Sequence, residues 1–348
     1  MIVRAILRSG GWVAAAACAA AILVGCGSSS PSAVDPHSPE ATRIAGLFWL
    51  MLWLSAGVYV VVLALVLASF RARRSSQPSG DDRAGWATPP RDDGSDRRRG
   101  IRFIAIGGLL MPMAVLTIVG VATVRTTNAL QRGPSVVKIN VVAERWWWRL
   151  TYPDDHVVTA NEIHVPVGEP VELTLTSDNV IHSVWVPQLQ GKTDVVPGQT
   201  NHMTFTADAA GTYRGQCAEF CGIGHALMAF VVIADPPADY ARWLAANAAP
   251  AVGPPAGAAE RGAQLLASSS CAGCHVIKGT AAVGTLGPDL THFGSRTTIA
   301  AGSLPNTPRD LGRWLADTQG VKPGALMPRI ELTSDQIGDL VAYLESMK

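Results

Sequence analysis

The chain has 348 residues, and its 28 basic and 27 acidic side chains leave a formal net charge of +1. This near balance gives no indication of a nucleic-acid or an acidic partner, and we expect no nucleic acid among the partners. The length allows two domains of ordinary size and a further segment. A mean hydropathy of +0.21 favours membrane segments over a wholly soluble chain.

Residues 1–25 predict a lipoprotein-type signal peptide. Arg4 and Arg8 precede an apolar run that is too short to span a bilayer comfortably. The run ends in Leu-Val-Gly before Cys26, a sequence that resembles the bacterial lipoprotein box, so Cys26 is the predicted site of acylation. An ordinary cleaved signal and a retained anchor are the alternatives.

Residues 26–133 predict a transmembrane hairpin. The segments 44–70 and 103–124 carry no charge, and each reaches the roughly twenty residues that a hydrocarbon core requires. A pair of buried helices in a globular domain is the alternative. The loop between them, 71–102, holds nine arginines and no lysine, which predicts a cytoplasmic location. The later domains then lie on the periplasmic side of a bacterial plasma membrane.

The remaining chain predicts an all-β domain followed by an all-α domain. Residues 134–235 contain short runs rich in valine, threonine and isoleucine, separated by turn residues, which favours a small sandwich or Greek-key barrel. The predicted strands are 136–143, 157–165, 171–176, 202–206, 211–215 and 229–234. Residues 236–257 are rich in Ala, Pro and Gly and predict a linker. Residues 258–348 predict helices, notably 258–269 and 335–347.

The stretch GQCAEFCGIGHALM, residues 215–228, concentrates possible metal ligands. Thiolates and imidazoles suit copper or zinc. A structural zinc site and a disulfide between Cys217 and Cys221 are alternatives, but a methionine at the end of the motif in a β domain favours copper. Two cysteines allow two metals to share both sulfurs. A further histidine must come from upstream, where His182 is preferred over the other candidates, which are His156, His164 and His202.

Residues 180–198 and 215–228 together closely resemble subunit II of the haem–copper cytochrome c oxidases, and the resemblance covers roughly residues 40–235. It implies a cupredoxin-like domain that holds a dinuclear copper centre, CuA. By this resemblance the bridging ligands are Cys217 and Cys221, the terminal ligands are His182 and His225, and the weak axial ligands are Met228 and the Glu219 carbonyl.

The same resemblance implies further roles. The Glu219 carboxylate would reach a magnesium ion at the boundary with subunit I, and Trp146 would lie where electrons enter. Core packing or a membrane-interface belt is the alternative for Trp147 and Trp148. Trp147 and Gln199 replace a usual tyrosine and a usual arginine. The family's glutamate of the second membrane helix is replaced by Ala105, so proton uptake by that route is not predicted.

The pentapeptide CAGCH, residues 271–275, is the signature of covalent c-type haem attachment. Cys271 and Cys274 would form the thioether bonds and His275 would bind the iron. A redox dithiol or half of a zinc site is the alternative. Residues 258–348 resemble a class I cytochrome c, which implies Met327 as the second axial ligand. His292 is a weaker candidate, and Met347 lies at a predicted frayed end.

The two resemblances together imply subunit II of a caa-type bacterial cytochrome c oxidase. Electrons from a c-type cytochrome would pass through the chain's own haem and CuA to subunit I, where oxygen is reduced and protons are translocated. The expected partners are subunits I and III, the cytochrome donor and the membrane. The rivals are a quinol oxidase subunit II, a nitrous-oxide-reductase type of enzyme, and a copper-delivery, sensor or electron-transfer lipoprotein outside any oxidase.

Overall fold

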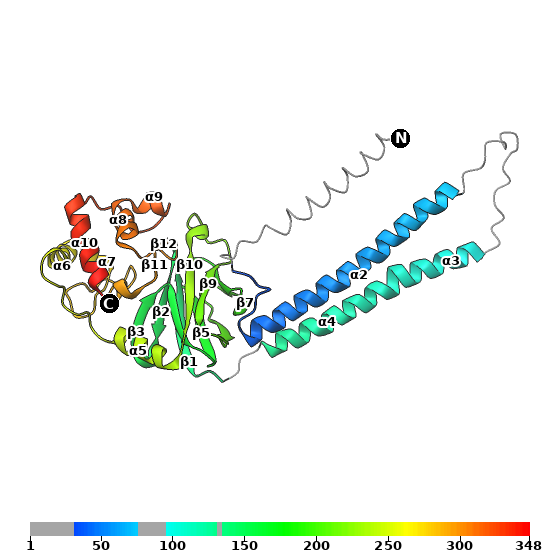
Figure 1. Ribbon diagram of the computed structural model, residues 1–348, viewed down its shortest axis with the longest axis horizontal. Helices are drawn as coiled ribbons and strands as arrows, with labels where there is room; N and C mark the ends of the chain where they lie inside the picture. The colour runs from blue at the N-terminus through cyan, green and yellow to red at the C-terminus, as the bar shows by residue number, and fades with distance from the viewer. Residues whose placement is uncertain (1–30, 76–94, 131–133) are drawn as a thin grey trace, which may run out of the picture.

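The computed structural model describes residues 31–75, 95–130 and 134–348. The predicted signal peptide, Cys26 and the middle of the arginine-rich loop lie outside the described residues. The described chain forms a long helical hairpin, then a β domain, then a helical domain at the opposite side of the β domain (Figure 1). The predicted fold class is confirmed, and its three parts follow one another in the predicted order.

The hairpin has one unbroken arm and one interrupted arm. Helix α2 spans Pro39–Ser75, and the second arm consists of α3 (Ser95–Ile104), a π-helical segment (Ala105–Leu110) and α4 (Met111–Ala129). The arms run side by side (Figure 1). Each contains a span of 33 residues that is long and apolar enough to cross a membrane, and its most apolar 18 residues are not buried within the protein. Such exposure does not fit the buried-helix alternative, and the two helices provide a membrane anchor.

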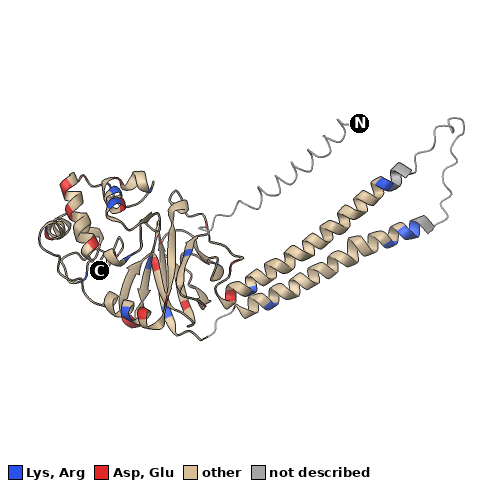
Figure 2. Ribbon diagram, in the orientation of Figure 1, with Lys and Arg blue, Asp and Glu red and all other residues tan. Residues whose placement is uncertain are grey.

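Two features of the hairpin differ from the prediction. Residues 71–75 and 95–102 are helical rather than part of a loop, because arginine is a good helix former outside the hydrocarbon core. Pro112 lacks an N–H donor, and the helix in front of it widens into the π-helical segment. Charged side chains lie near the two ends of the hairpin and are sparse between them (Figure 2).

The β domain consists of two five-stranded sheets. The first has the order β3 (Val157–Ala160), β2 (Trp147–Tyr152), β1 (Val137–Glu144), β5 (Val171–Ser177) and β8 (Asn201–Phe205). The second has the order β4 (Glu162–Pro166), β10 (Ala229–Asp235), β9 (Gly211–Cys217), β6 (His182–Val186) and β7 (Gln190–Val195). Alternate residues of β5 are buried, so one face of each sheet builds the common core.

The structure corrects the predicted strands at several places. The predicted run 157–165 is two strands in different sheets, because Asn161 adopts a left-handed φ of 64° and turns the chain. Its side chain accepts a hydrogen bond from the Trp148 backbone N–H at 2.9 Å. Strands β2, β6 and β7 were not predicted, since tryptophan, histidine and glutamine interrupt their valine and threonine pattern.

The predicted linker, residues 236–257, is largely helical. Helix α5 spans Pro237–Ala248 and packs against the β domain. Trp243 stacks on the His164 ring with centroids 4.0 Å apart. Tyr240, Trp243 and Leu244 recur at helical spacing, so this segment has an apolar stripe that a flexible linker lacks.

The helical domain contains α6 (Ala258–Ser268), α7 (Cys271–Cys274), α8 (Pro308–Ala316), α9 (Thr318–Val321) and α10 (Ser334–Ser346), with a small hairpin of β11 (Thr298–Ile299) and β12 (Leu304–Pro305). Helices α6 and α10 cross closely at Gly262, where a Cβ would lie 2.1 Å from the Asp339 carbonyl oxygen. The neighbouring Arg261 pairs with the Asp339 carboxylate at 2.6 Å. This crossing holds the domain's core together.

Candidate metal and haem sites

The cysteine loop, residues 217–228, connects β9 to β10 and lies beside the start of β6. The Cys217 N–H donates to the Met228 carbonyl at 2.9 Å, so the two ends of the loop are joined. The Ala218 N–H donates to the Ser183 carbonyl at 3.0 Å. These bonds bring His182, at the first position of β6, next to the two cysteines.

Three predicted ligand side chains, those of His182, His225 and Met228, converge on the sulfurs of Cys217 and Cys221. The sulfurs of Cys217 and Cys221 are 3.7 Å apart, which is far longer than the roughly 2.05 Å of a disulfide, and both thiols are free. His182 Nδ1 lies 3.8 Å from the Cys217 sulfur, and His225 Nδ1 lies 3.7 Å from the Cys221 sulfur. The Met228 sulfur is 3.9 Å from that of Cys221.

These spacings fit metal ions between the donor atoms. Two donors that each lie about 2.2 Å from one ion at a tetrahedral angle are about 3.6 Å apart. The Glu219 carbonyl oxygen lies 3.2 Å from the Cys217 sulfur and adds a fourth group beside the two sulfurs. His182, Cys217 and Cys221 are buried together and form a cluster that could hold an ion. The disulfide alternative is excluded by this geometry.

The tautomer of His182 is set by a neighbour that sequence reasoning missed. The Asn179 Oδ1 lies 3.0 Å from His182 Nε2, so a proton on Nε2 leaves Nδ1 free to face Cys217. Partners of this kind orient metal-binding imidazoles. The remaining upstream histidines have other environments: His164 is 2.8 Å from Asp235, His202 is 2.8 Å from Glu172, and His156 lies in a left-handed turn.

The two thiols share a proton. Donation from the Cys221 thiol, with contributions from His182 and backbone groups, lowers the pKa of Cys217 to about 3. The pKa of Cys221 is raised for the same reason, because its proton bridges to the Cys217 thiolate, and burial adds to this rise. A thiolate already stabilised by its surroundings is a strong metal ligand.

Trp146 covers the cysteine loop. Its indole Nε1 donates to the Cys221 carbonyl at 2.9 Å, and the side chain is 7% exposed. A Cβ at Gly224 would lie 2.5 Å from the ring, so glycine is needed there for the ring to pack. Trp148 instead fills the domain core, where its ring meets that of Phe230, and core packing accounts for this residue.

The Glu219 carboxylate does not by itself form a magnesium site. Its Oε2 lies 3.4 Å from Lys192 Nζ, and Asp194 lies 3.5 Å from the same nitrogen. Mg²⁺ requires near-octahedral oxygen coordination. Among the described residues, the Glu219 and Asp194 carboxylates both lie beside one ammonium group, so on their own they do not fit the ion.

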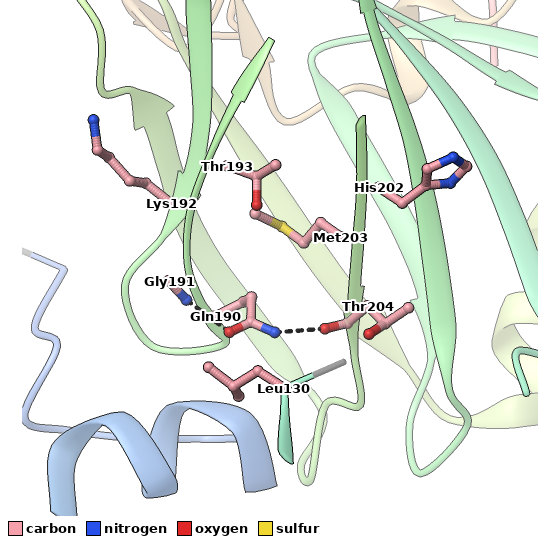
Figure 3. A pocket seen from close by; sticks show the side chains of 8 residues that line it. All are labelled: Leu130, Gln190, Gly191, Lys192, Thr193, His202, Met203 and Thr204. Atoms are coloured by element: carbon pink, nitrogen blue, oxygen red, sulfur yellow. Dashed lines mark hydrogen bonds between the residues drawn. The ribbon is translucent and has the colours of Figure 1, made fainter. Parts of the chain in front are cut away.

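A cavity of about 550 Å³ lies where the hairpin meets the β domain. Leu130 and Gln190 lie at one end of it, and the Gln190 amide donates to the Thr204 carbonyl at 2.7 Å (Figure 3). The charged or titratable side chains in its lining are Lys192 and His202. The cavity contains none of the predicted copper or haem ligands and is separate from both sites.

The CAGCH motif forms the one-turn helix α7 and the residue after it. Both Cys271 and Cys274 are free thiols, partly exposed. Residues 283–287 fold against this turn, because the Gly284 N–H donates to the Ala272 carbonyl and the Gly287 N–H donates to the Cys274 carbonyl. On that loop Val283 and Leu286 expose 73% and 79% of their surface. Exposed apolar groups beside two free thiols fit a covalently attached macrocycle.

His275 is oriented as an axial ligand requires. Its Nδ1 lies 2.8 Å from the Pro288 carbonyl oxygen, which fixes a proton on Nδ1 and leaves Nε2 for a metal. Burial lowers the pKa of His275 and so favours the neutral imidazole. A Cβ at Gly287 would lie 2.6 Å from the imidazole Cε1, so glycine is needed for the ring to take this position.

The three candidates for the second axial ligand differ in their surroundings. Met327 lies in the segment between α9 and α10, and its carbonyl accepts from Thr318 Oγ1 at 3.4 Å. His292 Nε2 is 3.0 Å from the Ala249 carbonyl. Met347 is 3% exposed and its carbonyl accepts from the Gly294 N–H, so the predicted frayed end is wrong, because this residue packs into the helical core.

Two sequence profiles match the chain. One is described as cytochrome c oxidase subunit II, periplasmic domain, and matches residues 155–235. The other is cytochrome c and matches residues 259–348. The cytochrome c oxidase subunit 2 of Alkalihalophilus pseudofirmus is 34% identical over 94% of this chain and 94% of its own. The chain belongs to the cytochrome c oxidase subunit 2 family.

Two further similar proteins match a smaller part of the chain. The quinol oxidase subunit 2 of Bacillus spizizenii is 28% identical over 64% of the chain and 68% of its own length. The crystal structure of the periplasmic domain of subunit II of cytochrome oxidase from Bradyrhizobium japonicum is 26% identical and covers 34% of this chain and 96% of that chain, with a TM-score of 0.33. Membership of the family implies a subunit I partner, a membrane context, copper and, through the second profile, haem.

Proposed function

We propose that this subunit is the electron conduit of a bacterial terminal oxidase. It accepts electrons from a c-type cytochrome through its own covalent haem c and passes them through a dinuclear CuA centre to subunit I, where oxygen is reduced to water with proton translocation. The observation that carries the proposal is the convergence of Cys217, Cys221, His182, His225 and Met228 around two sulfurs 3.7 Å apart.

When bound, the copper pair and the haem supply reversible one-electron exchange. The chain's own residues would hold each group. Cys217 and Cys221 would bridge two coppers, with His182 and His225 as terminal ligands and with Met228 and the Glu219 carbonyl as weak ones. Cys271 and Cys274 would attach the haem, and His275 would bind its iron. Met327 is proposed as the second axial ligand, a His and Met pair being typical of a high-potential cytochrome c.

The geometry of the protein supports this use of the sites. The buried sulfurs exclude water, and His182 is held in one tautomer by Asn179. Trp146 lies between the cysteine loop and the helical domain, which is where an electron would have to cross. The proposed magnesium ion would need most of its ligands from subunit I, and no step is assigned to it.

The topology of the membrane part is also proposed. The basic residues at the far end of the hairpin (Figure 2) would lie in the cytoplasm, and the β and helical domains would then face the periplasm. Cleavage of a signal peptide before Cys26 and acylation of that residue are proposed on the sequence alone. Ala105 opens the π-helical segment, so proton uptake would use a route other than a glutamate at this position. A subunit III partner and a c-type cytochrome as the electron donor are likewise proposed on the family resemblance.

Low-temperature electron paramagnetic resonance of the purified full-length protein tests the proposal. A multi-line hyperfine pattern from one electron shared by two coppers, beside a low-spin haem signal, is expected. Cys221→Ser should abolish the shared pattern and leave the haem signal intact, because serine is a harder ligand that does not bridge copper as a thiolate does. A hyperfine pattern from a single copper, or bound zinc without copper, would contradict the conduit.

A further inference from the structure

A buried lysine joins the helical domain to the β domain. Lys322 follows α9 and is 4% exposed. Its Nζ donates to the Trp146 carbonyl at 2.6 Å and to the Ala300 carbonyl at 3.1 Å. Lysine is almost never buried unless it is paired. Two backbone carbonyls, one from each domain, provide its partners here.

The segment around Lys322 also covers the Trp146 ring. Gly324 adopts a φ of +82°, and a Cβ there would lie 2.2 Å from the Ile223 side chain and 3.5 Å from the Trp146 ring. Ile223 belongs to the cysteine loop. Trp146 is therefore packed between Gly224 of that loop and the Lys322 segment of the helical domain.

A continuous hydrogen-bonded connection follows from these contacts. Lys322 donates to the carbonyl of Trp146, and the indole of Trp146 donates to the carbonyl of Cys221. One residue thus separates the helical domain from a proposed bridging ligand. A second contact joins the same regions nearby, where the Ala229 N–H donates to the Ala301 carbonyl at 3.0 Å.

The rest of the interface is fastened at a different place. One oxygen of Glu162, which is 3% exposed, accepts hydrogen bonds from the backbone N–H and the hydroxyl groups of Thr297 and Thr298, at 2.7 to 3.1 Å. Lys278 Nζ donates to the His156 carbonyl at 3.2 Å. These contacts attach the helical domain to the β domain without touching Trp146. A substitution can therefore alter the packing on Trp146 and leave these contacts in place.

We propose that Lys322 is a positioning residue, which holds Trp146 between the cysteine loop and the helical domain so that the two proposed redox groups keep one fixed separation. This role rests on the proposed function. A methionine of similar length could fill the space but would leave the carbonyl of the buried Trp146 without this donor, whereas the Ala300 carbonyl also accepts from Ser303 Oγ at 2.8 Å. A buried carbonyl without a donor is unfavourable, and the segment is then expected to move away from Trp146.

The test compares Lys322→Met with Lys278→Met in the full-length protein purified in detergent. Lys278 is the matched control, because it makes a lysine-to-carbonyl bond between the same two domains away from Trp146. Amide hydrogen exchange of residues 229 and 298–303 is measured first, since it needs neither metal nor haem. Transfer between the haem and the copper is then followed optically after rapid reduction of the haem.

For Lys322→Met we expect faster exchange at these amides and a transfer rate lower by about 10- to 100-fold, as for other partners that orient metal ligands. Lys278→Met should leave both unchanged. Unchanged exchange and an unchanged rate in Lys322→Met, with copper and haem contents equal to the parent, would overturn the proposal. Equal losses in both variants would do so as well.

Two further outcomes are separated by the design. If Lys322→Met does not accumulate, Gly324→Ala displaces the same segment from Ile223, and an unchanged transfer rate in that variant overturns the proposal. If the parent protein lacks the shared-electron copper signal, the proposed function fails. The exchange measurement then still decides whether Lys322 holds the segment on Trp146.

Discussion

The indole nitrogen of Trp146 donates a hydrogen bond to the carbonyl oxygen of Cys221, and 2.9 Å separates the two atoms. Trp146 is thus bonded to the backbone of a proposed copper ligand on one side. On the other side it is covered by the helical domain. One packed route from the helical domain to the proposed copper ligands therefore runs through this residue.

Replacing Trp146 by phenylalanine tests that relationship. The variant keeps an aromatic ring but loses the N–H donor, so the Cys221 carbonyl loses its partner. We expect copper to bind, with haem-to-copper transfer slower by about 10- to 100-fold, in keeping with other groups that support metal ligands. Trp243→Phe is the control, since that ring stacks on His164 rather than on the cysteine loop. A parent-like rate in Trp146→Phe would remove this residue from the pathway.

Gly224→Ala should displace the same ring from the other side. The added Cβ would lie 2.5 Å from Trp146 atoms, and overpacking of this kind costs about 1–3 kcal/mol. A lower thermal midpoint and weaker copper binding are expected, measured by calorimetry and copper titration. Gly253→Ala meets nothing within 4 Å and should behave as the parent does. Equal midpoints in the two variants would show that the loop relaxes freely.

Gly287→Ala probes the haem side. Its Cβ would lie 2.6 Å from the His275 ring, so the imidazole must move away from the Pro288 carbonyl that orients it. We expect a changed haem absorption spectrum and a shifted reduction potential, with copper binding unaffected. Gly338→Ala lies on an open helix face and should stabilise the domain by up to about 1 kcal/mol. An unaltered haem potential in Gly287→Ala would argue against His275 as the axial ligand.

Protonation of Lys322 should make the docking of the helical domain on the β domain depend on pH. Burial lowers its pKa from 10.5 to about 7. Below pH 7 both the docked and the separated states carry the proton, and the docked state bears the full cost of burying the charge. Between pH 7 and 10.5 the separated state binds more protons, so docking becomes more favourable as pH rises. The electrostatic interaction with Cys221 acts on the pKa of Lys322 in the opposite direction and is smaller than the effect of burial.

This dependence is measured by amide exchange at residues 298–303 between pH 6 and pH 10, corrected for the intrinsic exchange rate. The parent should show protection that increases above pH 7, and Lys322→Met should show none of that increase. A parent whose protection falls as pH rises would show that the ammonium form is the one that docks.

Much of the copper and haem chemistry could be predicted because it lies in short local motifs. Cys217, Cys221, His225 and Met228 fall within twelve residues, and Cys271 to His275 are contiguous. His182 was chosen from four upstream histidines, and the structure brings it to the cysteines. The ligand roles themselves stay predictions, because geometry alone does not bind an ion.

What could not be predicted depends on contacts between residues far apart in the chain. Glu162 and Thr297 meet across the two domains, as do Lys322 and Trp146, and neither pair has a sequence pattern. Strand β6 and helix α5 were missed for a related reason. Strand β6 is short and begins with His182 and Ser183, and α5 begins at the second of two prolines and is rich in alanine, so only the packed core shows which side of each element is buried.

The start of α2 has a consequence for assembly. The N–H of His37 donates to the Gln188 carbonyl, the carbonyl of His37 accepts from the Asp208 N–H, and the Glu40 carboxylate accepts from the Thr206 N–H. Two of these bonds come from His37, just before α2, and one comes from Glu40 in its first turn, so the start of the membrane helix is fastened to the β domain. The position of the cysteine loop relative to this helix is therefore constrained within the chain itself.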